Sequence, residues 1–541
     1  MTAPLCFKYK TASDRFYIYD TKTNEILRVS GELLAIVDDY GLLDSDAIIE
    51  KHKAYFTEQS LRDAVEALGD FSVKGVLCPH VPYHRPEILG LRLNDKNYSL
   101  EDFINTFSRM LTLELTHRCN LNCEYCCFGK HYANYRSHGT ASIPEETAKQ
   151  AIRYHLDKPE SGRTITFYGG EPLLEFSLLK RLVFYAEQYC ASTGKEPPHF
   201  SLTTNGTLLD DDICRFFVEH RFSVLVSLDG CKESHDRYRT FRANGLGTFD
   251  IILKNLYRFK ELYPDFMGRG ISLTLTADND FYMTNQVIKE LIESYPTLIV
   301  NFVNSNTNSL RNSLSCECEQ SGCTRSQEFQ AQESVPSFLN WTPESLKRYQ
   351  DCQNQFQEML FMSPEMARNE FPVFYKMFES DYRNLHKRMI KRQSRSPKVA
   401  CGCIPGAVRL YCAIDGAFYP CEKVEEISHL CIGNVEDGID HQKVRAMLEY
   451  LSNETECDTC VGKEFCSICP NYVTENNGEP NSGLIANYCA RISESSVNKL
   501  TAYTKIMETQ PSIFDVYKTE STGDDWLPHV QFVVRYVPVS S

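Results

Sequence analysis

The middle of the chain, residues 110–303, alternates short apolar runs with longer amphipathic stretches. Alternation at a period of two is typical of half-buried strands, and apolar residues at every third or fourth position are typical of helices that pack against them. Strand and helix repeated six times predict parallel strands, and therefore a partial (β/α)6 TIM-like barrel of the α/β class. The six predicted strands cover residues 111–116, 163–168, 200–204, 223–227, 271–276 and 298–303.

Residues 1–90 predict a separate small unit. Short strand-like runs at 5–9, 15–20 and 26–30 are followed by helical patterns at 32–40, 46–52 and 58–68. Three strands followed by three helices is a winged-helix-like order. Residues 91–109 are expected to link this unit to the barrel.

The part of the chain after the barrel has a different character. Residues 304–399 begin with a polar, turn-rich insertion and continue with helical patterns at 343–362 and 374–393. A cysteine-rich region follows at 400–495, with a predicted hairpin at 409–418, and we expect a helix and tail over 496–541. The stretch 529–537 alternates like a strand, and the sequence assigns it no function.

Charge and cysteine content narrow the class of protein. Lys+Arg 57 against Asp+Glu 72 gives a net charge of −15, which argues against a general nucleic-acid binder. The first 27 residues do not resemble a signal peptide, and no apolar run reaches the length of a membrane span. We therefore expect a cytoplasmic protein without a membrane partner. In that reducing compartment its 23 cysteines are better interpreted as metal ligands than as disulfides.

The strongest motif is a cysteine triplet directly after the first predicted strand. Cys119, Cys123 and Cys126 are spaced four and then three residues apart. Three thiolates on one short loop can hold three irons of a cubane cluster and leave the fourth iron open. A zinc site is the alternative, but zinc usually takes paired CxxC or HxxxH motifs instead of one odd triplet.

Polar groups recur where the following strands end. Gly169, Gly170 and Glu171 follow the second strand; bare glycines let backbone approach a ligand, and a carboxylate receives an ammonium group. Because parallel strands end at one edge, we expect these groups to meet near the cysteine loop. Four more candidates follow the third and fourth strands: Asn205, Ser227, Asp229 and Arg239.

A second set of cysteines lies near the carboxyl end. Its members are Cys403, Cys421, Cys457, Cys460, Cys466, Cys469 and Cys489. A zinc ribbon is one interpretation of the two CxxC pairs. Seven thiols are, however, nearly enough for two four-ligand iron–sulfur sites. Cys316, Cys318 and Cys323 in the insertion are expected to be reduced thiols on a loop.

The triplet, with Thr116 before it and Tyr125 inside it, resembles the cluster loop of the radical S-adenosylmethionine (SAM) enzymes. The resemblance implies that a [4Fe-4S] cluster on Cys119, Cys123 and Cys126 is catalytic. It also implies that SAM binds the open iron, with Tyr125 near the adenine. The amino group of SAM would meet Gly169, Gly170 and Glu171. Ser227 and Arg239 would hold the carboxylate or ribose of SAM, supported by Asn205 and Asp229.

The cysteine-rich region resembles the SPASM domain of radical SAM enzymes that modify peptides, which implies two auxiliary [4Fe-4S] clusters. By this likeness Cys403, Cys421 and Cys469 hold the first, and the second is held by Cys457, Cys460, Cys466 and Cys489. The sequence departs from the usual pattern in having two residues between Cys466 and Cys469, and in the unclear fourth ligand of the first cluster. Cys401 is one candidate; Cys412 and Cys431 are others.

Placed before such a barrel, residues 1–90 resemble the peptide-recognition element of maturases that act on ribosomally made peptides. There the leader of a precursor peptide adds as a strand, here along 26–30. The resemblance implies a maturase that joins a cysteine sulfur to carbon in a thioether, with a flavodoxin or ferredoxin as electron donor. Formylglycine formation of the sulfatase type, carbon-to-carbon crosslinking and quinone-cofactor maturation stay open. A multi-cluster electron carrier is the non-enzymatic alternative.

Overall fold

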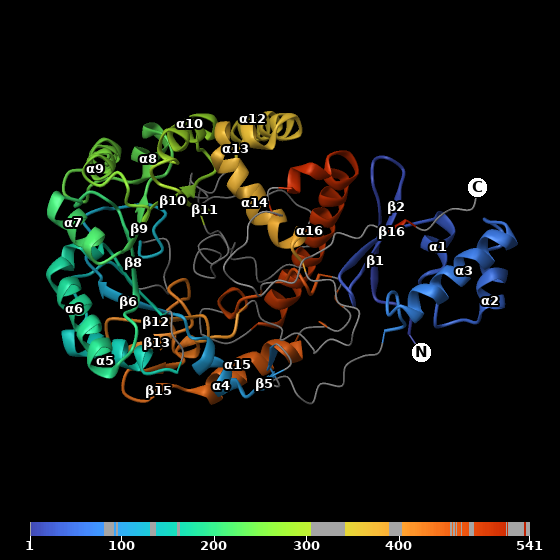
Figure 1. The fold of residues 1–541 in the computed structure, drawn as a ribbon, viewed down its shortest axis with the longest axis horizontal. Helices are drawn as coiled ribbons and strands as arrows, with labels where there is room; N and C mark the ends of the chain where they lie inside the picture. The colour runs from blue at the N-terminus through green and yellow to red at the C-terminus, as the bar shows by residue number, and fades with distance from the viewer. Residues whose placement is uncertain are drawn as a thin grey trace, which may run out of the picture.

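The structure is a computed structural model that describes most of the chain. The described residues are 2–80, 91–93, 96–129, 137–159, 163–303, 341–388, 403–454, 457, 460, 462–466, 468–474, 481–515, 517 and 535–536. Figure 1 shows the amino-terminal unit on one side and the barrel on the other, with helices of the carboxyl-terminal half between them. None of the described helices is both long and apolar enough to cross a membrane.

Six parallel strands form the barrel sheet, as the alternating pattern predicts. They pair in the order β11-β10-β9-β8-β7-β6, so each strand lies beside its neighbour in sequence. The bounds of the six strands are β6 Met110–Thr116, β7 Thr164–Gly169, β8 His199–Thr204, β9 Ser223–Ser227, β10 Arg269–Leu275 and β11 Thr297–Phe302. The expected α/β fold with a parallel sheet is therefore confirmed.

Helices cover the outer face of this sheet (Figure 1). In β6, Leu111, Leu113 and Leu115 are fully buried and share one core with Ala151 and Ile152 of α5. Burial of such alternate apolar side chains is the main stabilising term of a two-layer domain. The helices of the barrel are α5 Glu145–Leu156, α6 Phe176–Thr193, α7 Asp211–Glu219, α8 Lys232–Tyr238, α9 Phe249–Leu262 and α10 Phe281–Leu291.

A hairpin from the cysteine-rich region extends the barrel sheet. The predicted hairpin is present as β12 Arg409–Cys412 and β13 Ala417–Tyr419. The sequence did not show that β12 would also pair in parallel with β6, from Arg409 opposite Met110 to Cys412 opposite Leu113. This edge of a partial barrel would otherwise present unpaired backbone groups. Two short strands, β14 Gly433–Asn434 and β15 Gly438–Ile439, continue the same sheet.

The amino-terminal unit has the predicted order of three strands and three helices. Its strands are antiparallel in the order β1-β2-β3, and its helices begin at Ser30, Asp44 and Thr57, whose side chains each accept a hydrogen bond from the backbone three residues on. The bounds are β1 Cys6–Lys10, β2 Phe16–Asp20, β3 Glu25–Val29, α1 Gly31–Ile36, α2 Ser45–His52 and α3 Glu58–Val73.

The range 91–109, expected as a linker, contains structure of its own. The described residues there form β4 Leu91–Leu93, β5 Lys96–Tyr98 and α4 Leu100–Phe107. Ser99 caps the helix, and Leu100 and Ile104 are buried at helical spacing. An amphipathic helix of only two turns was too short to stand out in the sequence pattern.

The carboxyl-terminal helices lie between the two ends of the molecule. They are α12 Pro343–Met362, α13 Pro364–Glu370, α14 Pro372–His386, α15 His441–Glu454 and α16 Ser482–Thr509. Helix α16 runs without a break through residue 495, where the sequence analysis had placed a boundary between the cysteine-rich region and a terminal helix. The insertion with Cys316, Cys318 and Cys323 lies outside the described residues.

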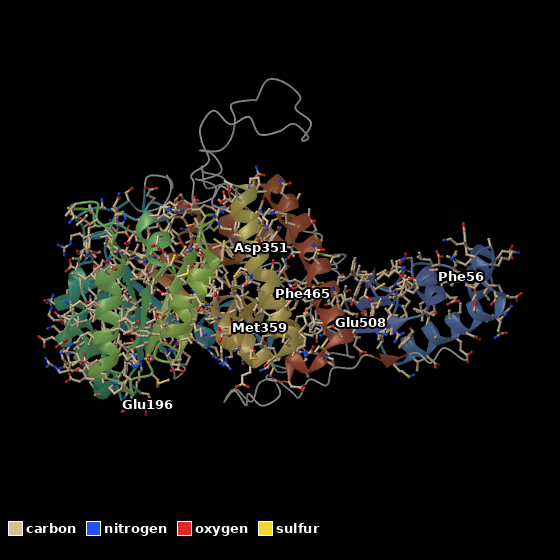
Figure 2. The ribbon with its side chains drawn as sticks, turned by 90° about the horizontal axis from the view of Figure 1, so that it is seen from above. Phe56, Glu196, Asp351, Met359, Phe465 and Glu508 are labelled. Carbon is tan, nitrogen blue, oxygen red and sulfur yellow. The ribbon has the colours of Figure 1, made fainter. Side chains whose placement is uncertain are left out.

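Helix α16 also holds the amino-terminal unit. The Glu508 carboxylate accepts hydrogen bonds from Thr11, Ser13 and Tyr17 at 3.0, 2.8 and 2.7 Å, and Tyr9 bonds Thr504. Figure 2 shows Glu508 at the junction between the helix and the unit. As a result β2 is buried on both faces, because Ile18 packs under α1–α3 while Tyr17 and Tyr19 join the main core.

A short strand from the carboxyl-terminal tail, β16 Arg535–Tyr536, lies on the outer edge of β3. It pairs in parallel, with Arg535 opposite Leu27 and Tyr536 opposite Arg28. The alternating stretch at 529–537 therefore contributes a strand. The free edge of β3 accepts an added strand, which is the property that peptide recognition by strand addition requires.

We predict that Phe167→Ala destabilises the barrel more than Phe184→Ala. Phe167 is fully buried and stacks with Phe200 and Phe222, with ring centroids 6.2 and 6.1 Å away, whereas Phe184 is 47% exposed. Loss of a buried phenylalanine costs about 3–5 kcal/mol, so the midpoint of thermal unfolding should fall by roughly 10 °C. Equal midpoints for the two variants would show that this aromatic stack does not stabilise the sheet.

Candidate active site at the carboxyl ends of the strands

The cysteine loop leaves the end of β6 and is held by backbone hydrogen bonds. Asn122 N–H donates to the Thr240 carbonyl at 2.9 Å and Glu124 N–H to the Tyr238 carbonyl at 3.1 Å. A bridge between Leu121 and Phe241 continues this pairing. The segment after α8 thus forms a second wall for the loop that carries Cys119, Cys123 and Cys126.

The three thiols lie close enough to influence one another. Burial raises the pKa of Cys119 to about 12, and Cys123 and Cys126 add to the shift. Burial also raises the pKa of Cys123 to about 12, against the opposing effect of Arg239. A bound cation reverses this preference, because a metal deprotonates a coordinating thiol.

The spacing of the ligand side chains differs between a cluster site and a site for a single metal ion. Among the described residues no three cysteine, histidine or carboxylate side chains converge tightly enough to hold one metal ion. In an iron–sulfur cubane each thiolate binds a different iron, so its ligands stand apart. The triplet on this loop would hold three irons of such a cluster.

Gly169 and Gly170 lie directly beneath the cysteine loop. Gly170 N–H donates to the Thr116 carbonyl and Glu171 N–H to the Arg118 carbonyl, both at 2.8 Å. A side chain at Gly170 would overlap the Arg118 carbonyl oxygen, and Gly169 has φ of +135°. The structure gives these glycines a reason that the sequence analysis did not find: they let the cysteine loop pack against the end of β7.

Glu171 is almost fully buried and joins two strand ends. Its carboxylate accepts hydrogen bonds from Thr204 Oγ1 at 2.8 Å, Asn205 N–H at 2.7 Å and Leu173 N–H at 3.0 Å. Burial raises its pKa to about 7 in spite of these bonds. A carboxyl group in this state gains from a cationic partner, which would restore its charge.

Asn205 belongs to a ring of hydrogen bonds with the cysteine loop. Its Nδ2 donates to Asn120 Oδ1 at 2.8 Å, Asn120 Nδ2 donates to Thr207 Oγ1 at 2.8 Å, and Thr207 Oγ1 donates to Asn205 Oδ1 at 2.7 Å. The sequence analysis missed Asn120 and Thr207. Only their positions in the sequence could have indicated them, because Asn120 follows Cys119 and Thr207 comes two residues after Asn205.

Tyr125, Asp229 and Arg239 form a buried network beside Cys123. The Tyr125 hydroxyl donates to Asp229, as does Arg239 Nε at 2.5 Å, and Thr274 N–H donates to the other carboxylate oxygen at 2.9 Å. The Arg239 guanidinium lies 5.5 Å from the Tyr125 ring centroid and 3.9 Å from Cys123 Sγ. Ser227 is buried at the end of β9, opposite Ser272 of β10.

Cys127, which the sequence analysis did not select, is next to the triplet. Its hydrogen bond with Cys126, together with burial, raises the pKa of the Cys126 thiol well above its usual value, and His138 opposes this. The site therefore has a fourth thiol beside the three that were predicted.

The carboxyl-terminal cysteines gather in two places. Burial raises the pKa of Cys489 to about 11, and Cys457, Cys466 and Cys460 add to the shift, so these four lie together. Cys457, Cys466 and Cys489 share a small core with Ile485 and Tyr488 at the start of α16. Four thiols at one place suit a complete four-ligand cluster.

The second group is less complete among the described residues. Burial, Glu422 and then Cys403 raise the pKa of Cys421 to about 11, so Cys403 and Cys421 are neighbours. The segment after Cys469 is tied to the same loop, because Glu425 N–H donates to Asn471 Oδ1 at 2.8 Å. Cys401 lies outside the described residues, and Cys412 is a fully buried residue of β12.

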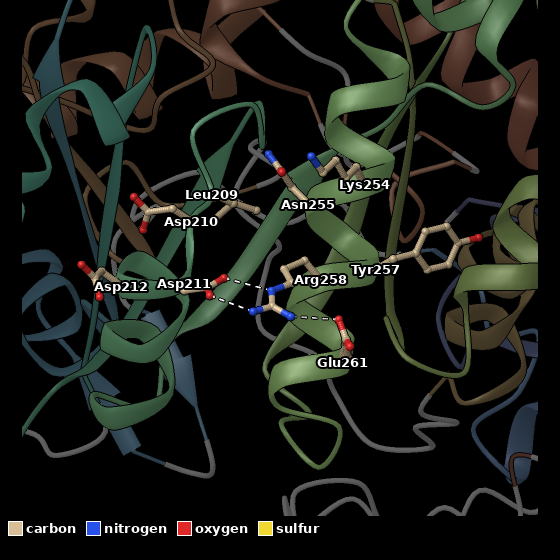
Figure 3. A pocket seen from close by; sticks show the side chains of 9 residues that line it. All are labelled: Leu209, Asp210, Asp211, Asp212, Lys254, Asn255, Tyr257, Arg258 and Glu261. Carbon is tan, nitrogen blue, oxygen red and sulfur yellow. Dashed lines mark hydrogen bonds and ion pairs between the residues drawn. The ribbon is translucent and has the colours of Figure 1, made fainter.

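A surface pocket of about 930 Å³ lies elsewhere, between α7 and α9 on the outer layer. Figure 3 shows Arg258 between Asp211 and Glu261. Arg258 pairs with Asp211 at 2.9 Å and with Glu261 at 3.1 Å. These internal ion pairs leave little unsatisfied charge for a ligand, so the strand-end site is the better candidate.

Comparison with known proteins agrees with this geometry. Residues 113–283 match the sequence profile of the radical SAM superfamily. A cysteine-type anaerobic sulfatase-maturating enzyme of Clostridium novyi is 32% identical over 158 residues, which are 28% of this chain and 41% of that protein. A serine-type anaerobic sulfatase-maturating enzyme of Bacteroides thetaiotaomicron is 32% identical over 168 residues, 30% of this chain and 40% of that protein. The chain thus matches less than half of the length of these curated relatives.

A more distant relative and a solved structure complete the comparison. The radical SAM cyclopropyl synthase TigE of Paramaledivibacter caminithermalis is 24% identical over 190 residues, 33% of this chain and 38% of that protein. The solved structure of native anSMEcpe with bound AdoMet superposes with a TM-score of 0.51 at 18% identity, covering 76% of this chain and 99% of that one, which shows a shared fold. Residues 113–283 of this chain are a radical SAM domain, related in sequence to the anaerobic sulfatase-maturating enzymes.

Proposed function

We propose that this protein is a radical SAM maturase that installs a thioether crosslink in a ribosomally synthesised precursor peptide. The observation that carries the radical chemistry is the three-cysteine loop held against Gly170 and Glu171 at the strand ends. Three thiolates leave one iron of a [4Fe-4S] cluster open. The buried Glu171 carboxyl is placed to take the ammonium of SAM.

The residues present fit these cofactors. Cys119, Cys123 and Cys126 would hold the first cluster, and the four thiols around Cys489 would hold a complete second one. Cys403, Cys421 and Cys469 would hold a third. When bound, SAM and the first cluster supply a 5′-deoxyadenosyl radical, which takes hydrogen from unactivated carbon. This chain's part is to orient SAM through Glu171, Asn205, Ser227, Asp229 and Arg239 and to exclude water from the barrel.

A thioether product explains the extra cysteines. Joining a cysteine sulfur to carbon removes one hydrogen atom from the carbon, and one proton and one electron from the thiol. The electron needs an acceptor, and two auxiliary clusters in the cysteine-rich region would provide one. An external flavodoxin or ferredoxin would supply the electron that starts the reaction.

The amino-terminal unit supports a precursor peptide as the substrate. The outer edge of β3 already accepts β16 as an added strand, so its backbone groups are accessible to pairing. A leader peptide would take the same edge and displace β16. The unit rests on α16, the helix that also carries Cys489, which supports a link between a bound leader and the cysteine-rich region.

Formylglycine formation is the second candidate. The first relatives named above are sulfatase-maturating enzymes of the cysteine and serine types, and a solved neighbour contains AdoMet with a Cp18Cys peptide. That reaction needs no leader edge. Mass spectrometry of the modified peptide separates the two, because a thioether lowers the mass by two hydrogens and resists thiol alkylation, whereas formylglycine introduces an aldehyde.

Iron content tests the cluster assignment. We expect about twelve irons per chain after anaerobic reconstitution, and about eight for the Cys119→Ala/Cys123→Ala/Cys126→Ala variant, because one of three four-iron clusters is lost. Deoxyadenosine formation should disappear in that variant. Cys78→Ser, in the amino-terminal unit, is the control and should keep about twelve irons. Zinc without iron in the wild type would contradict the proposal.

Glu171 provides a second test. Glu171→Gln should weaken SAM binding by about tenfold or more, since hydrogen bonds to charged groups contribute about 1.5–3 kcal/mol. Iron content should stay at the wild-type value, as measured in the same sample by equilibrium binding and iron assay. Glu187→Gln, on the outer helix α6, is the matched control. Unchanged SAM affinity in Glu171→Gln would remove this residue from the site.

Hydrogen exchange tests the leader edge. A precursor peptide for this test would be encoded by a neighbouring small, cysteine-rich open reading frame. Its leader should slow amide exchange in β3, and a chain ending at residue 517 should bind it more tightly than the full chain because β16 no longer competes. Exchange that is unchanged in β3 but slowed elsewhere would refute recognition at this edge and leave the radical chemistry untouched.

A further inference from the structure

A buried group of basic side chains lies at the opposite end of the barrel from the cysteine loop. His155 is in the last turn of α5, Lys158 follows it, and Arg163 immediately precedes β7. Their exposed fractions are 0%, 8% and 5%. Three basic residues from one connection are therefore buried together at the amino-terminal end of the strands.

Asp157, the acidic residue that the structure describes in this connection, is already paired. Asp157 Oδ1 accepts hydrogen bonds from the Tyr189 hydroxyl at 2.6 Å and from Lys195 Nζ at 2.7 Å. Within the described part of the chain, Lys158 and His155 take part in no ion pair with a carboxylate. Lys158 instead lies 4.7 Å from the centroid of the Tyr154 ring. Burial raises the pKa of the Tyr154 hydroxyl, and the carboxylate of Glu101, an exposed residue of α4, adds to this rise.

Several donors in this group have no acceptor. Lys158 Nζ and Ser108 Oγ are buried without a hydrogen-bond partner. Neither ring nitrogen of His155 reaches hydrogen-bonding geometry, although the Thr164 backbone lies nearby. The Arg163 guanidinium donates to the Ser108 carbonyl, which brings Ser108 into the same group. Buried polar groups are almost always paired, so Lys158, Ser108 and His155 lack an acceptor among the described residues.

The electrostatics point in the same direction. Burial and Arg163 lower the pKa of Lys158 to about 7. Burial, Arg163 and Lys158 together lower the pKa of His155 well below its usual value. Mutual repulsion of this kind is relieved when an anion enters, because each cation then gains an opposite charge at short range.

We propose that Ser108, His155, Lys158 and Arg163 form a binding site for a free tetrahedral oxyanion, of which inorganic phosphate is the type. Two cations, a hydroxyl and an imidazole N–H supply donors in the number that such an anion accepts. The burial of all four residues favours a small free anion over a phosphate group carried on a larger molecule. Bound there, the anion would tie together the end of α4, the end of α5 and the start of β7.

The test is titration of the reconstituted full chain with inorganic phosphate at constant ionic strength, followed by calorimetry. We expect one saturable site in the wild type. Lys158→Met should raise its dissociation constant by about tenfold or more, because a charge-assisted hydrogen bond is lost. Lys149→Met is the matched control on α5, since Glu145 and Glu146 already pair with Lys149, and it should bind phosphate like the wild type.

A second measurement covers the case in which Lys158→Met does not fold. Crystals of the wild type soaked in arsenate should show an anomalous peak within hydrogen-bonding distance of Lys158 Nζ and the Arg163 guanidinium. Water alone at that position, or no saturable phosphate binding by the wild type, would overturn the proposal. Equal binding by the wild type and Lys158→Met would do the same.

Discussion

The site depends on a backbone contact between two neighbouring strand ends. Gly170 N–H and Glu171 N–H donate to carbonyls of Thr116 and Arg118, so the loop that carries the cysteines lies on the turn after β7. Only a residue without a side chain fits beneath the Arg118 carbonyl. Backbone hydrogen bonds fix the position of a loop more firmly than its exposed side chains do, because both partners belong to the sheet framework.

From this contact the remaining side chains take their places in turn. Glu171 accepts from Thr204 and Asn205 and so joins the end of β8 to the end of β7. Asn205 then reaches back to Asn120 in the cysteine loop. On the other side, Asp229 accepts hydrogen bonds from Tyr125 and Arg239 beside Cys123. The ends of β8 and β9 thus support the loop through Asn205 and Asp229, and the end of β7 supports it through the Glu171 N–H.

The sequence predicted the elements whose pattern is local and long. The six barrel strands and the hairpin at 409–418 followed from the alternation of apolar and polar residues. A strand with one buried face has an apolar side chain at every second position. Pairing between distant segments left no such mark. Nothing in residues 409–412 distinguishes a strand that joins β6 from one that stays in its hairpin, and nothing around residue 495 marks that α16 continues.

The candidate site divides in the same way. Cysteine spacing and the groups after each strand could be found from chain order, since parallel strands end at one edge. The partners of those groups could not, because Asn120, Thr207 and Cys127 carry no motif of their own. Even the two glycines were selected for an incomplete reason: their nearest neighbour is the protein's own backbone.

Helix α16 connects the amino-terminal unit to the cysteine-rich region. It carries Cys489 near its start and Thr504 and Glu508 near its end, and at 1.5 Å per residue Cys489 and Glu508 are separated by about 28 Å along the axis. Close to the cysteines around Cys489, Tyr19 of β2 lies against Phe465, the residue before Cys466. The two ring centroids are 5.6 Å apart. A single helix is stiff over such a length. The amino-terminal unit and the cysteines around Cys489 therefore share one helix as a support, and the contact of Tyr19 with Phe465 joins them a second time.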